Sequence, residues 1–82
     1  MEFTKKQVAQ YEAIRRSGQV NMLDTHGVMS LAYQYDFEEL ERACISLTVY
    51  GQLLKQYSSL MTRYGLWELE ADEIEELAYH GV

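Results

Sequence analysis

Apolar residues recur at helical spacing along most of this sequence, and glycines separate the periodic stretches in a chain that has no proline. In the first stretch, Val8, Tyr11 and Ile14 fall on one helix face. Thr4 stands where a helix N-cap is favoured, and Gly18 stands where a left-handed C-cap ends a helix. The pattern predicts a helix over residues 5–17, whose last turn carries two cations that complement the helix dipole, Arg15 and Arg16.

The same reasoning predicts three further helices, over residues 25–34, 37–64 and 67–79. Asp24 is the N-cap candidate of the first of them. Asp36 and Glu39 form a capping-box pattern that opens the long helix, and Gly65 is suited to end it. We therefore predict an all-α fold of about four helices in a single helical domain over residues 1–82.

The long predicted helix follows a 3-4 alternation of apolar and small residues, which is the pattern of a helix that packs against another helix. Its core positions from residue 47 onward are Leu47, Gly51, Leu54, Ser58 and Met61. A straight helix of this length would measure ~42 Å, whereas a domain of this chain length is only ~30 Å across. The helix must therefore break near Gly51 or be covered by a second subunit. Because Gly51 lies inside the heptad pattern, we expect a homo-oligomer, a dimer or larger, that packs through this helix.

Charge is segregated along the chain, whose formal net charge is −6. Residues 42–67 hold three bases and no acid, whereas residues 68–82 hold six acids and no base. These acids form a candidate acidic partner surface: Glu68, Glu70, Asp72, Glu73, Glu75 and Glu76. We expect the acidic segment to dock on the basic helix, within or between chains, with mimicry of phosphate charge as an alternative. The net negative charge argues against direct DNA binding, which depends on neutralising phosphates.

Three tyrosines spaced by seven residues, Tyr50, Tyr57 and Tyr64, form a ladder along the long predicted helix. The ladder lies in the acid-free segment, together with Lys55, Arg63 and Arg42. Tyrosine supplies an apolar ring with a polar tip, which suits a helix–helix or subunit interface. The same residues could instead stack a nucleobase and hold a phosphate, so a groove for a small nucleotide is the second interpretation.

The sequence contains no motif for catalysis, for a metal or for a cofactor. Neither His26 nor Cys44, the single cysteine, belongs to a nucleophile–base signature, and Cys44 falls at a heptad core position where it acts as a small hydrophobe. No apolar run is long enough to span a membrane, and the N-terminus has no apolar core of a secretory signal. We expect a non-enzymatic protein without a metal or cofactor.

Residues 16–24, which read RSGQVNMLD, are followed by Val28, by Ala32 and by the stretch FEEL at residues 37–40. This arrangement resembles an uncharacterised family of short phage- and prophage-encoded proteins with a Ser-Gly-x-x-Asn-Met-x-Asp-x-x-x-Val core. The resemblance covers residues 8–45, and the chain departs from it at Asp36, where that family usually has glycine. It implies an accessory protein of a virus or mobile element that acts in a bacterial cytoplasm.

Three functions are compatible with these observations. The leading hypothesis is a small phage-type accessory protein that binds a host macromolecule, with interference in host defence as one form, and inhibits or redirects it. The second is a protein that sequesters a small nucleotide signal. The third is a structural component of a virion or complex.

Overall fold

The computed structural model describes residues 2–81, and these residues form helices with no strand among them, so the predicted all-α class is confirmed. The helices, in chain order, are α1 (Lys5–Ser17), α2 (Thr25–Gln34), α3 (Glu38–Cys44), α4 (Leu47–Arg63) and α5 (Ala71–His80). No helix within this part of the chain is both long enough and apolar enough to cross a membrane.

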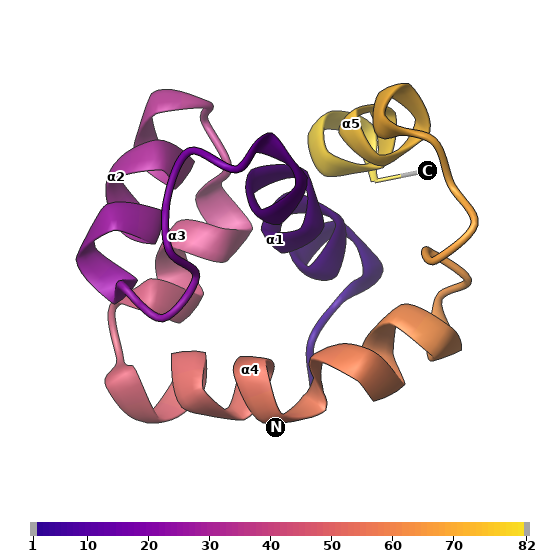
Figure 1. Cartoon of the computed structure of the whole chain (residues 1–82). Coiled ribbons are helices and arrows are strands. Elements are labelled where there is room, and N and C mark those ends of the chain that lie inside the picture. Colours follow the sequence, from indigo (N-terminus) through magenta and orange to yellow (C-terminus); the bar gives the residue numbers. More distant parts are fainter. Residues whose placement is uncertain (1, 82) are drawn as a thin grey trace.

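Helix α1 lies at the centre and contacts each of the other four helices (Figure 1). Helices α2 and α3 lie on one side of it, α4 runs beneath it, and α5 covers its other side, where the contact is most extensive. The fully buried side chains come from all five helices and from the segment after α4, and they include Val8, Ile14, Val28, Leu40, Leu53, Leu60, Met61, Leu66 and Ile74. A single core therefore surrounds α1.

The predicted bounds of the first two helices are confirmed. The Oγ1 of Thr4 accepts a hydrogen bond from the backbone N–H of Gln7 at 3.0 Å, and Gly18 ends α1 in the left-handed conformation at φ 67°. The Oδ1 of Asp24 likewise accepts from the backbone N–H of Gly27 at 3.1 Å. Both helices begin where local capping chemistry places them, and α1 also ends there.

The predicted single helix over residues 37–64 is wrong, because the chain breaks after Cys44 and forms α3 and α4. Ser46 adopts an extended conformation (φ −111°, ψ 123°), and its Oγ accepts from the backbone N–H of Val49 at 3.3 Å. Ser46 is therefore the N-cap of a new helix. The alternative break near Gly51 is wrong as well, since Gly51 lies inside α4.

The break removes the geometric reason for a second subunit. Helix α4 has 17 residues, which corresponds to ~25 Å of helix at 1.5 Å per residue. The longest dimension of the folded chain is 27 Å, so α4 fits within it. The predicted helix over residues 37–64 was too long for the domain unless it broke or a second subunit covered it. The chain breaks.

The start of α3 also differs from its prediction. Asp36 has a φ of 60°, and Phe37, which is buried, occupies the N-cap position without a capping side chain. The predicted capping box of Asp36 and Glu39 does not form. Aspartate is one of the few side chains that tolerate this left-handed conformation, which glycine adopts without strain. The family that residues 8–45 resemble usually has glycine at this position.

The acidic helix begins four residues later than predicted, at Ala71 instead of residue 67. Gly65 ends α4 at φ 65°, and residues 66–70 then form a connection to α5. Glu70 and Glu73 form the capping box of α5, in which the backbone N–H of Glu70 donates to the Oε1 of Glu73 at 3.0 Å. The residues before Glu70 therefore lie outside the helix.

Candidate functional site

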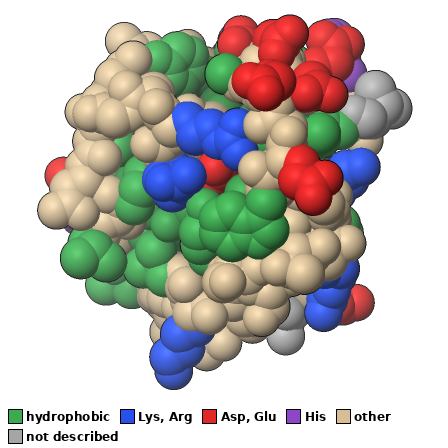
Figure 2. Space-filling model, turned by 45° about the vertical axis from the view of Figure 1, so that its right-hand side comes forward, with side chains coloured by type: hydrophobic (Ala, Val, Ile, Leu, Met, Phe, Trp, Pro, Cys, Tyr) green, Lys and Arg blue, Asp and Glu red, His purple; other side chains and the backbone are tan. Residues whose placement is uncertain are grey.

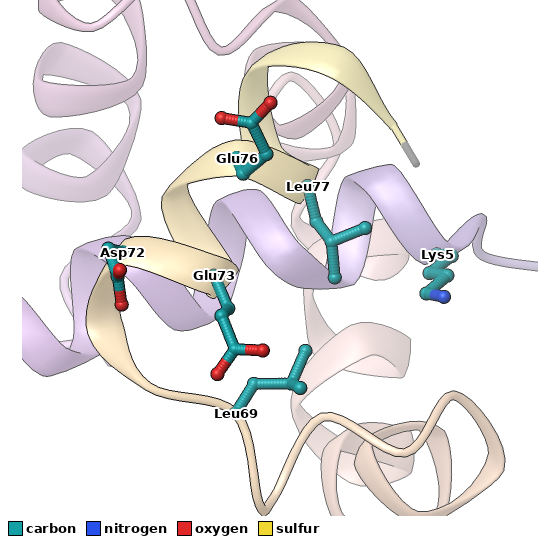
Figure 3. Close-up of a pocket in the computed structure, with 6 residues that line it drawn as sticks. All are labelled: Lys5, Leu69, Asp72, Glu73, Glu76 and Leu77. Atoms are coloured by element: carbon teal, nitrogen blue, oxygen red, sulfur yellow. The ribbon is translucent and has the colours of Figure 1, made fainter.

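A groove of about 510 Å³ opens between the start of α1 and α5 (Figure 3). Its lining residues, which define the acidic groove, are Lys5, Leu69, Asp72, Glu73, Glu76 and Leu77. Figure 3 shows Glu73 and Leu77 pointing from α5 toward Leu69, with Lys5 at the α1 end of the groove. Helix α5 thus supplies carboxylates and one leucine, and the connection from α4 supplies a second leucine.

The acidic groove combines negative charge with an apolar lining. Asp72, Glu73 and Glu76 are exposed, while Leu77 is buried and Leu69 is half-buried. Lys5 is the single cation in the lining. Figure 2 shows acidic side chains gathered over α5 at the top of this face, with basic side chains and a hydrophobic patch below them. Such a surface suits a ligand that is both cationic and aliphatic.

The carboxylates of the groove differ in how many hydrogen bonds or ion pairs they already make within the chain. Glu73 is used partly in the helix cap described above. The Oε1 of Glu76 lies 4.0 Å from the Nε2 of His80, and Asp72 makes no ion pair with any residue of the range 2–81. Asp72 and Glu76 are therefore the acids most available to a ligand.

The predicted acidic partner surface is only partly assembled in one place. Three of its six residues line the acidic groove, namely Asp72, Glu73 and Glu76. Glu75 faces a smaller cavity of about 170 Å³ that Tyr35 and Tyr79 also line. Glu70 caps α5, and Glu68 is exposed in the connection before it.

A buried carboxylate, Glu12, lies at the centre of a second charged group. Its Oε1 accepts from the Nε of Arg15 at 2.8 Å and from the hydroxyl of Tyr57 at 2.6 Å. Its Oε2 accepts from the Nη2 of Arg15 at 2.8 Å and from the Nε of Arg16 at 2.6 Å. Burial raises the pKa of Glu12, but the hydrogen bonds from Arg15, Tyr57 and Arg16 outweigh it, so its pKa lies below the ordinary value. We refer to Glu12, Arg15, Arg16 and Tyr57 as the Glu12 cluster.

The Glu12 cluster holds the connection that lines the acidic groove. The Nη1 of Arg16 donates to the carbonyl of Leu69 at 2.6 Å, and its Nη2 donates to the carbonyl of Leu66 at 3.3 Å. Leu69 is a groove residue, whereas Leu66 is buried in the core. Arg16 is therefore a positioning residue for the groove, since it fixes the backbone from which Leu69 projects.

The tyrosine ladder faces the interior and not an open groove. Tyr50 is buried, and its hydroxyl donates to the carbonyl of Met22 at 2.6 Å. Tyr57 donates to Glu12, and Tyr64 donates to the carbonyl of Phe3 at 2.6 Å. The spacing of seven residues does place all three on one face of α4, and this face packs against the N-terminal part of the chain.

The structure does not bring the predicted cations to the tyrosine ladder. Lys55 is exposed, and because it lies two residues from Tyr57 it points to the opposite side of α4. Arg63 is exposed near Glu2, with 3.7 Å between its Nη1 and the carboxylate, and Arg42 is exposed on α3. The cation that does lie over a ladder ring is Arg15, whose guanidinium carbon is 5.7 Å from the centre of the Tyr57 ring.

The predicted oligomer positions have different environments. Met61 is fully buried in its own chain and cannot belong to a subunit interface. Leu47 is 74% exposed, Ser58 is exposed, and Gly51 and Leu54 are half-buried. Packing between subunits through this face of α4 stays a prediction.

The two residues considered for nucleophilic chemistry have ordinary surroundings. Cys44 is buried, and burial raises the pKa of its thiol to about 11, which disfavours the reactive thiolate. His26 is exposed near the start of α2. Within residues 2–81, no group of three or more His, Cys, Asp or Glu side chains is arranged to hold a metal ion.

The Glu12 cluster was not predicted from the sequence, where Arg15 and Arg16 were interpreted only as complements of the helix dipole. Glu12 lies three and four residues before these arginines, which is the spacing of helical ion pairs and could have indicated the pairing. The partner hydroxyl from Tyr57 comes from 45 residues away, so no local pattern could have indicated it.

Comparison with known families finds one similarity, in the N-terminal part of the chain. Residues 3–42, which span α1, α2 and most of α3, match the model of a family described as a domain of unknown function (DUF5049). This part of the chain is therefore similar to an uncharacterised domain family, in line with the resemblance seen in the sequence, while the phage origin stays a prediction. No curated protein and no solved structure matches the chain.

Proposed function

We propose that this protein is a non-enzymatic accessory protein whose acidic groove binds a positively charged segment of a partner protein and thereby inhibits or redirects that partner. The observation that carries this proposal is the composition of one groove, in which three carboxylates and two leucines face a single lysine. Exposed charges on this scale mainly steer the encounter and select the partner, and they do so less strongly at high salt.

The two components of the groove select for different parts of the partner. Leu69, which is half-buried, offers apolar surface, whose burial contributes roughly 25 cal/mol per Å². Asp72 and Glu76 offer carboxylates to lysine or arginine side chains, and arginine can pair with a carboxylate through two hydrogen bonds. The chemistry that fits both is a basic segment with aliphatic side chains between its charges.

The biological setting belongs to the same proposal. The resemblance over residues 8–45 supports a phage or prophage protein that acts in the cytoplasm of a bacterial host, where interference with host defence is one form of redirection. For the nucleotide alternative, the tyrosine hydroxyls already donate within the chain. No observation favours that alternative or a structural role over partner binding.

A pull-down from host lysate with matched variants tests the proposal. The groove variant carries Asp72→Asn and Glu76→Gln, and the control variant carries Glu38→Gln and Glu41→Gln on α3, which removes the same charge away from the groove. We expect wild type and control to retain one stoichiometric partner with a basic surface, and the groove variant to retain at least about tenfold less. Equal retention by all three proteins would refute the groove as the binding surface.

A further inference from the structure

The corner between α3 and α4 exposes two aliphatic side chains beside a cation. Ile45 is 76% exposed and Leu47 is 74% exposed, and Arg42 is exposed one turn earlier. Arg42 forms no ion pair with any residue of the described part of the chain. Single exposed hydrophobic residues are common on protein surfaces, but a pair next to a free arginine forms a small amphipathic projection. We call Arg42, Ile45 and Leu47 the basic corner.

The basic corner is complementary to the acidic groove, because it offers a positive charge and aliphatic side chains. The groove presents the exposed Asp72 and Glu76 near the half-buried Leu69, and the corner presents one guanidinium and two aliphatic side chains. The stretch from Arg42 to residue 67 contains no acid, so the chain that continues from the corner adds no repulsion. The two surfaces are complementary both in charge and in apolar character.

The corner and the groove of one chain are far apart. Figure 1 shows the α3–α4 junction at the lower left and α5 at the upper right, on opposite sides of α1. The corner therefore cannot fill the groove of its own chain. In a second copy, however, the same groove is open to it.

We propose that the basic corner of one copy docks into the acidic groove of a second copy. Arg42 faces Asp72 and Glu76, while Ile45 and Leu47 cover the exposed part of Leu69. Because the contact joins two different surfaces, each copy keeps one free corner or one free groove, and the association continues into a ring or an open chain. Small interfaces of this type are weak and reversible. The proposal rests on the groove of the proposed function, so a second copy and a partner compete for it.

Sedimentation velocity of purified protein tests the docking in the absence of any host partner. We expect the weight-average mass of wild type to rise with concentration across the micromolar range and to fall with added salt. The corner variant (Ile45→Ser with Leu47→Ser) and the groove variant (Asp72→Asn with Glu76→Gln) change exposed side chains, so both are expected to fold, which circular dichroism verifies. Each variant alone should stay monomeric.

Mixing the two variants distinguishes this contact from a symmetric one. The corner variant keeps an intact groove and the groove variant keeps an intact corner, so an equimolar mixture should form a dimer that grows no further. The variant with Glu38→Gln and Glu41→Gln should associate at least as strongly as wild type, because it loses acids that precede Arg42 on α3.

Three results would overturn the docking: a wild type that is monomeric throughout, variants that associate like wild type, or a mixture that stays monomeric while wild type associates. None of them bears on the host partner. In the pull-down, a wild type that retains no partner, or a groove variant that retains as much as wild type, would refute the proposed function alone.

Discussion

The Glu12 cluster and the acidic groove use the same types of side chain in opposite ways. In the Glu12 cluster, a fully buried carboxylate receives four hydrogen bonds from two arginines and a tyrosine. In the groove, exposed carboxylates face one lysine. The two regions differ in whether their carboxylates are paired with donors within the chain. This pairing, and not the amount of charge, distinguishes a structural site from a candidate binding site. The two regions meet at Leu69, whose carbonyl binds Arg16 and whose side chain lines the groove.

The largest expected effect on stability comes from removing the buried charge of the Glu12 cluster. In Glu12→Gln, the amide group of the new side chain would face an arginine donor and leave charged donors without an acceptor. We expect the free energy of unfolding to fall by about 3 kcal/mol. Urea denaturation measures this, with Glu76→Gln as the exposed control, for which a change within about 0.5 kcal/mol is expected. Similar losses in both variants would contradict the distinction between the two regions.

The tyrosine ladder gives a finer version of the same test. Tyr57→Phe removes a hydroxyl that donates to the charged Glu12, whereas Tyr64→Phe removes one that donates to the neutral carbonyl of Phe3. Hydrogen bonds to charged groups contribute more than neutral ones, so we expect a loss of about 2 kcal/mol for the first and about 1 kcal/mol for the second. The reverse order in urea denaturation would show that Tyr57 does not support Glu12.

The smallest of these effects appears on acidification. The pKa of Glu12 is lowered in the folded state, so its stabilising contribution is complete above the ordinary value of 4.5 and is lost as the pH falls from there through the lowered pKa. We therefore expect the difference in unfolding free energy between wild type and Glu12→Gln to shrink below pH 4.5. A difference that stays constant with pH would mean that the pKa of Glu12 is the same in the folded and the unfolded protein.

Much of the fold could be predicted where local chemistry alone decides the structure. Thr4, Gly18 and Asp24 mark the ends of α1 and the start of α2, because their capping bonds are made within three or four residues. Ser46 carried the same kind of signal, but the apolar periodicity of Cys44 and Leu47 continues across it. The cap signal of Ser46 and the apolar periodicity predict different structures, a helix break and a continuous helix. Both α3 and α4 pack against α1, and no local pattern contains this tertiary information.

The candidate site was predictable to a smaller extent. The acidic residues were evident from the sequence, but their groove exists only because α5 packs along α1 and brings Lys5 close to them. The tyrosine spacing correctly indicated one helix face, and it left open whether that face packs against another helix, as it does on α1, or lines a groove. Leu69 could not have been predicted, since it is placed by the hydrogen bond that Arg16 makes from a position 53 residues earlier.

The central claim is that the acidic groove binds a partner while the Glu12 cluster only builds the groove. The host pull-down with the Asp72→Asn and Glu76→Gln variant tests it most directly, provided that urea denaturation shows an unchanged free energy of unfolding. The account predicts that this folded variant loses the partner and that the Glu38→Gln and Glu41→Gln control keeps it. Retention of the partner by the groove variant at the level of wild type would contradict the account.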